Sequence, residues 1–484
     1  MNTFQKLLVT LFLFQASLFA ASKTVFVPRS TTRDSVLELS QANYFFYHNE
    51  ARCDEEYPWF YFFFNPFVQR SFNDKDLAKY FLKDNKSCLS IREDGLGDVN
   101  PEWLGLIAPA GSNFSSVFNV RPVRTAYGAY FNMYFDLCRF WEGLWLGIET
   151  AAMGVTHKLK PCETVTTGAE NPVNNFGTID NIRIFTDAIN NPELCFGRFN
   201  KCKVSRGGLD DIQVKLGQNY FFREDDHIGL YLVANIPTGK MQRATYVFEP
   251  LVGSKHAGVG IGLNADFNLY GCDDHMLNWM FDLKYLYLFK ANQLRLFDLC
   301  ANGDWSRYLQ VVQNSDTPML TQPGTKFFTQ CVKVTPKSEI NFWTALHYEF
   351  CRYNFELGYN LWWRDCERVC QKCANPPVAI ADLANFIACQ GISASGANIS
   401  QSVIGPNIAP TDSVFTNVGP FNIDSGTAPR VLTHKLYASF AYDYLICSYP
   451  AMVGITTACE FATGRNKRNA LEQWQIFLTL GFTY

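Results

Sequence analysis

Apolar and polar residues alternate with a period of two in much of this chain, and the pattern is clearest at its end. One face of residues 474–484 is mostly polar, and the other face holds Trp474, Ile476, Leu478, Leu480, Phe482 and Tyr484. Successive side chains of a β-strand point to opposite sides, so this segment predicts a strand with one apolar face. A soluble sheet can use such a strand at an edge or in a sandwich. A transmembrane barrel uses it as the closing strand, with lipid outside and water inside.

Similar segments recur along the chain, and the connections between them alternate between long and short. Soluble β-sandwiches also alternate, but their turn signals recur every 8–12 residues or so, and they do not need outward rows this aromatic. Long outer loops and short periplasmic turns are typical of membrane barrels. We therefore predict an all-β fold, a transmembrane antiparallel β-barrel of about 12 strands (range roughly 10–16). The expected strands lie in residues 59–72, 128–137, 144–149, 212–217, 228–236, 259–269, 281–289, 342–350, 353–364, 436–444, 452–461 and 474–484.

The first expected strand, residues 59–72, does not alternate and is predicted from its aromatic density alone. Pro66 lies inside it and favours an irregularity or a bulge, because proline lacks a backbone N–H. We predict that this strand pairs with the last one, because closure removes the sheet edges that lipid does not tolerate.

The beginning of the chain has the features of a Sec signal peptide. Lys6 precedes a short apolar core, and small residues follow from Ala16 to Ser22. We predict a signal peptide over residues 1–22, with cleavage after Ala20 or Ser22. The alternative is a retained anchor helix, but the core is short and Gln15 interrupts it. The mature protein is then exported to the cell outer membrane, with a periplasmic N-terminal segment over residues 23–56 and the barrel over residues 57–484.

Composition supports a barrel over a helical membrane protein or a nucleic-acid-binding protein. Charged residues make up 18% of the chain and aromatic residues 15%, yet the mean hydropathy is close to zero. Apolar and polar residues are therefore finely mixed. After the signal peptide there is no apolar run of about 20 residues such as a membrane helix needs. The net charge of -3 gives no field that favours nucleic acid.

The polar faces of the expected strands carry charged residues, which in a barrel line the lumen because a charge that faces lipid costs a few kcal/mol at mid-depth. Acidic residues outnumber basic ones in this set, which favours cations unless a loop folds into the pore. The alternative is a closed, hydrogen-bonded interior of the kind found in small barrels. The predicted pore-lining residues are Asp136, Glu149, Lys215, Asp266, Asp282, Lys284, Glu349, Glu356, Arg364 and Asp443.

Sixteen cysteines are many for an exported chain of this length. Cys138, Cys272, Cys351 and Cys447 fall at predicted short turns, which places them together at the periplasmic rim. There they can form disulfides with other envelope proteins or in a homo-oligomer. The alternatives are that they pair within the chain or stay reduced.

A second group of cysteines has the spacing C-x3-C-x2-C, formed by Cys366, Cys370 and Cys373. This spacing matches iron–sulfur enzymes, but that chemistry needs a reducing cytosol and the chain is exported. We expect a loop disulfide cluster with Cys389, with zinc as a minor alternative. No metal or cofactor is predicted.

The chain shows no constellation for hydrolysis. There is no G-x-S-x-G elbow, and no His-x-Ser pattern of outer-membrane phospholipases. His347 and Glu349 share one face of an expected strand, but two residues on one strand do not make a triad. We predict no catalytic residue and no enzymatic activity.

The signal peptide, alternating strands, long loops and terminal aromatic residue together resemble a Gram-negative outer-membrane porin. The high cysteine count and the short stretches Arg70–Phe72, Asn302–Ser306 and Leu357–Asn360 resemble the major outer-membrane-protein-like porins of chlamydia-like bacteria. The resemblance covers most of the mature chain and implies passive diffusion of small solutes through a disulfide-stabilised envelope. It brings no functional residue with it.

We therefore expect a porin that lets small hydrophilic solutes and ions diffuse passively. The alternative is a disulfide-cross-linked structural or adhesive envelope protein. The partners expected are outer-membrane lipid and the barrel-assembly machinery, for which Tyr484 is a candidate signal.

Overall fold

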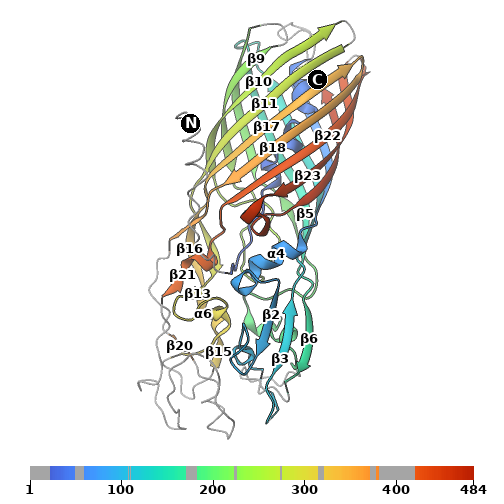
Figure 1. Ribbon diagram of the computed structural model, residues 1–484. Helices are drawn as coiled ribbons and strands as arrows, with labels where there is room; N and C mark the ends of the chain where they lie inside the picture. The colour runs from blue at the N-terminus through green and yellow to red at the C-terminus, as the bar shows by residue number, and fades with distance from the viewer. Residues whose placement is uncertain are drawn as a thin grey trace, which may run out of the picture.

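Twelve antiparallel strands close into a barrel in the computed structural model (Figure 1). The structure describes residues 22–48, 59–106, 108–109, 111–169, 182–222, 226–272, 275–313, 321–370, 378–380, 420–447 and 449–484. The predicted signal peptide lies outside them, apart from Ser22. Around the barrel the strands are β1 (Phe60–Ser71), β4 (Val123–Asp136), β5 (Leu144–Lys158), β8 (Ile212–Phe221), β9 (His227–Ile236), β10 (Gly258–Cys272), β11 (His275–Leu288), β17 (Lys337–Phe350), β18 (Tyr353–Arg364), β22 (Val431–Ile446), β23 (Tyr449–Ala462) and β24 (Gln473–Thr483).

The last strand pairs with the first, as predicted, so the sheet has no open edge. β1 and β24 run antiparallel from Tyr61 opposite Thr483 to Ser71 opposite Gln473. The predicted irregularity at Pro66 is small. The β1–β24 ladder skips Asn65 and Pro66, but the register is the same on both sides, so there is no bulge.

The outer surface of the barrel is apolar, and the inner surface combines buried polar residues with aromatic ones such as Phe63 and Trp343. In β23, for example, Val453 and Ile455 are 40% and 44% exposed on the outside, whereas Thr456 faces inward and is buried. A closed barrel that exposes rows of large apolar side chains in this way has the surface that lipid requires. Among the described residues, no helix is long and apolar enough to cross a membrane.

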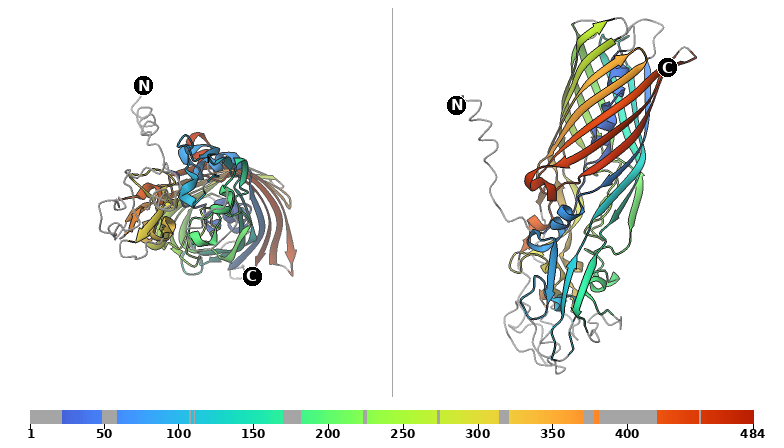
Figure 2. Two further views of the ribbon diagram at one scale, coloured as in Figure 1. Left: turned by 90° about the horizontal axis from the view of Figure 1, so that it is seen from below. Right: turned by 45° about the vertical axis from the view of Figure 1, so that its right-hand side comes forward.

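The two ends of the barrel differ, and we call them the short-turn end and the long-loop end. Tight connections join β4 to β5, β8 to β9, β10 to β11, β17 to β18 and β22 to β23 at the short-turn end, where β24 also finishes. The longer connections gather at the other end and form an extension beyond the barrel (Figures 1 and 2). The predicted alternation of long and short connections is therefore confirmed.

The extension has its own secondary structure and core, although the sequence predicted long loops there, with residues 294–299 as a possible extra strand. Three-stranded sheets form from β2 (Cys88–Arg92), β3 (Ser115–Asn119) and β6 (Cys162–Thr167), from β12 (Ala291–Leu296), β16 (Thr329–Thr335) and β19 (Arg368–Cys370), and from β14 (Gln310–Gln313), β15 (Thr321–Pro323) and β20 (Val378–Ile380). β13 (Asp298–Leu299) pairs with β21 (Phe421–Asn422), and β7 (Val204–Leu209) extends β5. A buried cluster around Phe81, Phe118 and Trp305 holds these parts together.

Short helices complete the extension. They are α4 (Asp74–Phe81), α5 (Phe185–Ala188), α6 (Gly324–Phe328), η2 (Lys83–Asn85), η3 (Pro101–Leu104), η4 (Pro192–Leu194), η5 (Ser306–Tyr308), η6 (Ile423–Gly426) and η7 (Gly464–Arg468). Of these, η7 lies in the connection between β23 and β24.

Residues 22–48, which we call the inner segment, run inside the barrel. The segment contains η1 (Thr31–Arg33), α2 (Ser35–Leu39) and α3 (Ala42–Tyr47). At the long-loop end the backbone N–H of Lys23 donates to the Tyr80 carbonyl (3.0 Å), and at the other end of the segment His48 contacts Asp266 of β10. The sequence led us to expect a periplasmic segment over residues 23–56. The structure places the described part of it against the inside of the barrel, where ion pairs and aromatic packing hold it.

Candidate functional site in the barrel lumen

The inner segment folds into two short helices with a sharp turn between them. The carboxylate of Asp34 accepts a hydrogen bond from the Val36 backbone N–H (3.2 Å) and so caps the start of α2. Gln41 has a φ of 60°, in the left-handed region, and separates α2 from α3. Both helices are shorter than an isolated helix needs to be stable, so contacts with the barrel wall hold them.

Glu38 of α2 is the centre of the largest ion-pair network in the described lumen. Its carboxylate pairs with Lys215 of β8 and with Lys284 of β11, the latter at 2.9 Å. Lys215 also pairs with Glu149 of β5 at 3.0 Å, and Tyr130 donates to Glu149 at 2.5 Å. Both lysine side chains are at most 3% exposed, so the segment carries a counter-charge that two buried ammonium groups need.

A second network lies one helical turn earlier in the segment. The Asp34 carboxylate pairs with Lys435 of β22 at 2.5 Å, and Lys435 also lies 3.5 Å from Glu460 of β23. On the adjacent residue, Arg33 pairs with Glu339 of β17 at 2.5 Å. Each charged residue of α2 and η1 described above therefore faces a residue of opposite charge on the wall.

The short-turn half of the segment makes polar and aromatic contacts. Tyr44 donates to Glu349, and its ring stacks on His347 with centroids 3.7 Å apart. The Gln41 backbone N–H donates to Glu356 at 3.0 Å, and His48 lies 2.7 Å from an Asp266 oxygen. The segment is therefore anchored at both of its ends.

Side-chain amides of the wall satisfy the backbone of the inner segment. Asn65 of β1 donates to the Leu37 carbonyl (2.8 Å), Asn132 of β4 to the Glu38 carbonyl (3.0 Å), and Asn341 of β17 to the Arg33 carbonyl (2.9 Å). β1 and β4 are neighbours in the barrel, whereas β17 belongs to another part of the wall. Amides at these positions explain how a chain without regular strand pairing stays buried in the lumen.

The predicted pore-lining residues lie on the inner face, where many contact the inner segment. Glu149, Lys215, Asp266, Asp282, Lys284, Glu356 and Arg364 are buried there, and Glu349 and Asp443 are half-buried near the short-turn end. Asp136 instead ends β4 and accepts the backbone N–H of Cys138 (2.8 Å) in the turn. Whether these residues line an open pore stays a prediction.

The inner segment itself is the functional element that the sequence did not predict. Residues 35–43 gave no clear strand or helix pattern. One signal was available: the aromatic run Tyr44–Tyr47 is followed by a polar stretch, as expected for a segment that packs apolar groups against a wall and then leaves it. Its ion-pair partners lie far away in the sequence, so no local pattern could reveal them.

Thirteen cysteines lie in the described part of the chain, and the structure forms no disulfide among them. Cys272, Cys351 and Cys447 are exposed at the short-turn end, and Cys138 is half-buried in the β4–β5 turn, as predicted. Cys366 and Cys370 are free thiols, and Cys373 and Cys389 lie outside the described residues. No group of His, Cys, Asp and Glu within the described ranges has the geometry of a metal site.

No known protein family matches the sequence, and no curated protein does. Solved outer-membrane barrels show a weak structural similarity. An outer membrane channel from Pseudomonas putida F1 has 9% identity and a TM-score of 0.38, with 90% of this chain and 100% of that chain covered. A Pseudomonas aeruginosa FadL homologue has 8% identity and a TM-score of 0.28, with 88% and 89% covered. OmpT, an outer membrane protein of Vibrio cholerae, has 9% identity and a TM-score of 0.24, with 90% and 100% covered.

Similarity this weak identifies neither a family nor a substrate for this chain. The finer resemblance to porins of chlamydia-like bacteria stays a prediction. The geometry of the chain itself is informative: the inner segment lies in the lumen, where ion pairs, hydrogen bonds and aromatic contacts with the wall hold it.

Proposed function

We propose that this protein is an outer-membrane channel for small hydrophilic solutes and ions, closed by its inner segment in the state described here. The observation that carries the proposal is the pairing of Glu38 with Lys215 and Lys284 in the lumen. A barrel whose only role is structural has no need of charges that a separate segment neutralises. A channel needs charged groups on its wall, because these groups face water once the segment has left the lumen.

Opening requires the inner segment to move out of the lumen. Its contacts with the wall oppose this movement, and their chemistry determines how it can take place. Breaking one partner of a buried ion pair costs on the order of 3–5 kcal/mol, so the closed state is favoured. Water can replace the polar contacts of the segment. Opening must in addition separate Phe45 and Phe46 of α3 from the aromatic rings of the wall, such as Tyr134. His48, the last described residue of the segment, and Phe60, the first residue of β1, both lie at the short-turn end.

Planar-bilayer recording of the purified full chain tests this function. Wild-type protein should give rare stepwise openings, and Glu38→Gln should raise the open probability by on the order of tenfold or more, because it removes a charge that holds the segment. Glu142→Gln is the matched control, since Glu142 is exposed in the β4–β5 turn. Folded wild-type and Glu38→Gln barrels that both stay silent would contradict the proposal.

A second candidate is an envelope protein cross-linked through disulfides to partners or to further copies. The observation that favours it is the group of exposed thiols at the short-turn end, Cys272, Cys351 and Cys447. Non-reducing gels of the cell envelope should then show high-mass species that collapse with a thiol reductant. Replacement of these three cysteines by serine should remove the species, and their persistence would count against this role.

Delivery to the outer membrane is part of the proposal. We infer that the signal peptide directs export and that the barrel-assembly machinery recognises the C-terminal strand, which ends on the exposed Tyr484. The apolar outer surface supports lipid as the surroundings of the barrel.

A further inference from the structure

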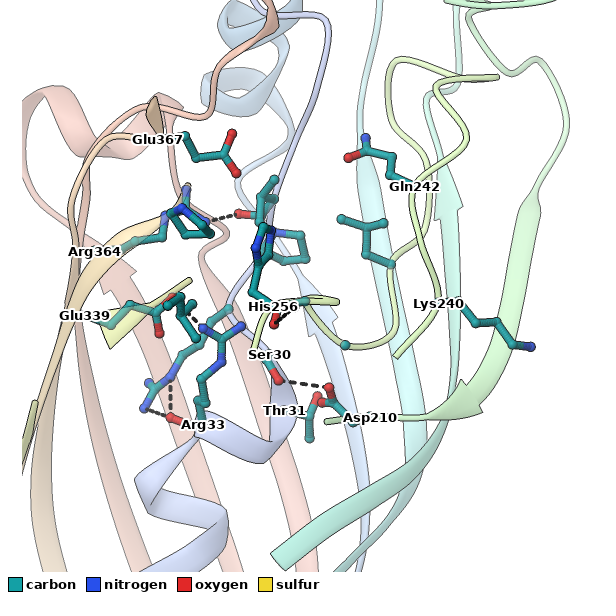
Figure 3. Close-up of a pocket in the computed structure, with 18 of the residues that line it drawn as sticks. Ser30, Thr31, Arg33, Asp210, Lys240, Gln242, His256, Glu339, Arg364 and Glu367 are labelled. Carbon is teal, nitrogen blue, oxygen red and sulfur yellow. Dashed lines mark hydrogen bonds and ion pairs between the residues drawn. The ribbon is translucent and has the colours of Figure 1, made fainter. Parts of the chain in front are cut away.

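A cavity lies at the long-loop end of the lumen, beside the inner segment. Its volume is about 620 Å³, counted with the open space at its mouth, and it follows the segment from Val27 to Thr31. Val27, Pro28 and Arg29 are half-buried, whereas residues 22–26 and 30–47 are buried. In Figure 3, Arg364 and Glu367 lie on one side of this cavity, Gln242 lies on the other, and Ser30 and Arg33 lie between them. We call this cavity the vestibule.

Two buried arginines of the vestibule lack a carboxylate partner. Arg364 at the end of β18 donates to the carbonyls of Val27 (2.9 Å) and Pro429 (3.3 Å), and Arg124 near the start of β4 donates to the amide oxygens of Gln69 and Gln473, both at 3.1 Å. They are 2% and 3% exposed. Among the described residues, no carboxylate lies within 4.0 Å of either guanidinium, and the Nε of each has no hydrogen-bond partner.

The acidic residues of the vestibule are already engaged. Glu339 pairs with Arg33 at 2.5 Å, and Glu367 pairs with Arg295, next to the vestibule, at 3.1 Å. Asp210 accepts hydrogen bonds from Ser30 (2.9 Å) and from the Thr32 backbone N–H (3.0 Å). Burial beside Asp211 raises the pKa of Asp210, which weakens its negative charge further. Arg124 and Arg364 therefore have no carboxylate in direct contact, and only acids farther away, such as Glu367 near Arg364, offset their charge.

The rest of the lining is partly apolar. Val27, Pro28, Met153, Leu251, Leu288 and Pro336 contribute to it. Apolar walls with a few convergent charged groups are typical of sites for small organic molecules. Buried guanidinium groups select carboxylates, because they form charge-assisted, often bidentate, hydrogen bonds.

We propose that the vestibule binds a small organic anion, whose carboxylate offsets the charge of Arg124 and Arg364 and whose apolar body packs on the wall. The site belongs to the closed state, so binding does not depend on whether the barrel conducts. A second cavity of about 320 Å³ lies on the other side of Val27–Arg29 and shares Arg124. A ligand in the vestibule therefore touches residues that hold the inner segment in place.

Titration of the purified, folded full chain with sodium benzoate tests the proposal, with the uncharged benzamide as the matched probe. Calorimetry should show saturable binding of benzoate, with benzamide at least tenfold weaker. Arg364→Met and Arg124→Met should each weaken benzoate binding tenfold or more. Arg92→Met should leave it unchanged, because Arg92 is a surface residue that pairs with Asp94 outside the vestibule.

If an arginine variant fails to fold, the comparison of benzoate with benzamide on the wild-type protein still tests the proposal. Equal binding of benzoate and benzamide, no binding of either, or unchanged affinity in both folded arginine variants overturns the proposal. Bilayer recording is a separate measurement. A barrel that binds benzoate but never conducts supports the anion site and contradicts the channel function. A barrel that conducts but does not bind benzoate supports the channel function and contradicts the anion site.

Discussion

Glu38 of the inner segment and Lys284 of β11 form an ion pair of 2.9 Å across 246 residues of chain, and both side chains are 2% exposed. Neither residue is unusual in the sequence. Their pairing couples the position of a short N-terminal segment to the wall of a barrel whose strands come from the whole chain.

Glu38→Gln should loosen the inner segment without unfolding the barrel. The substitution leaves Lys215 and Lys284 with Glu149 as their remaining ion-pair partner, at a cost on the order of 3 kcal/mol. Hydrogen exchange should therefore accelerate in residues 22–48 and stay unchanged in β10, β11 and β17. Uniformly faster exchange throughout the barrel, or no change in the segment, would contradict this expectation.

A charge on the outer surface should destabilise the barrel in a manner that depends on depth. Ile455 lies in the middle of β23 and is 44% exposed on the outside, whereas Ile446 is the last residue of β22, at the short-turn rim. Ile455→Arg should lower the free energy of unfolding in lipid by about 2–4 kcal/mol, and Ile446→Arg by about 0–1 kcal/mol. Equal effects at the two positions would show that the outer surface does not face a bilayer.

Gly358 of β18 is needed for the packing of an inward aromatic ring. A Cβ at this position would lie 2.4 Å from the ring of Tyr437, whose hydroxyl donates to Glu356 at 2.5 Å. Gly358→Ala should displace the ring and lower stability by about 1–3 kcal/mol. The control is Gly207→Ala in β7, where the nearest atom is 3.7 Å away. The thermal unfolding of both variants, followed by gel mobility, measures the difference, and equal losses would contradict it.

The extension should become less stable as pH rises through weakly acidic values. Burial raises the pKa of Asp298 to about 6, although Arg307 opposes the shift. An unfolded aspartate has a pKa of about 3.9. Between about pH 4 and 6 the folded state therefore binds more protons than the unfolded state, and stability falls as pH rises, by on the order of 3 kcal/mol in total.

Hydrogen exchange of residues 297–309 at several pH values measures this slope. Asp298→Asn should remove it, whatever its effect on overall stability. The control, Asp94→Asn, changes an exposed carboxylate of the same extension and should keep the slope. A slope that survives in Asp298→Asn would assign it to another group.

Much of the barrel could be predicted from the sequence because the strand period is local. Each of the twelve strands falls on a segment predicted from its alternation or its aromatic density. The pairing of β1 with β24 follows from closure alone, and Pro66 is tolerated because the ladder skips it without a change of register.

The lumen could not be predicted in the same way because its occupant has no period. Asp34, Glu38 and Tyr44 lie in helices of five and six residues or cap them, and their partners are hundreds of residues away. The extension was missed for a related reason: its strands are short and its core comes from separate loops. The turns that carry Cys138, Cys272, Cys351 and Cys447 could be predicted because each joins two strands that are consecutive in the sequence.

A reversible cross-link between the inner segment and the barrel wall shows whether the segment closes the channel. Ser40 of the segment and Thr456 of β23 are in side-chain contact, with their hydroxyl oxygens 3.3 Å apart, so cysteines at these two positions are the pair to oxidise. In planar bilayers, the oxidised Ser40→Cys/Thr456→Cys variant should be silent, and a thiol reductant should restore wild-type openings. Each single variant should conduct with and without reductant. A cross-linked double variant that conducts as the wild type does would contradict the account.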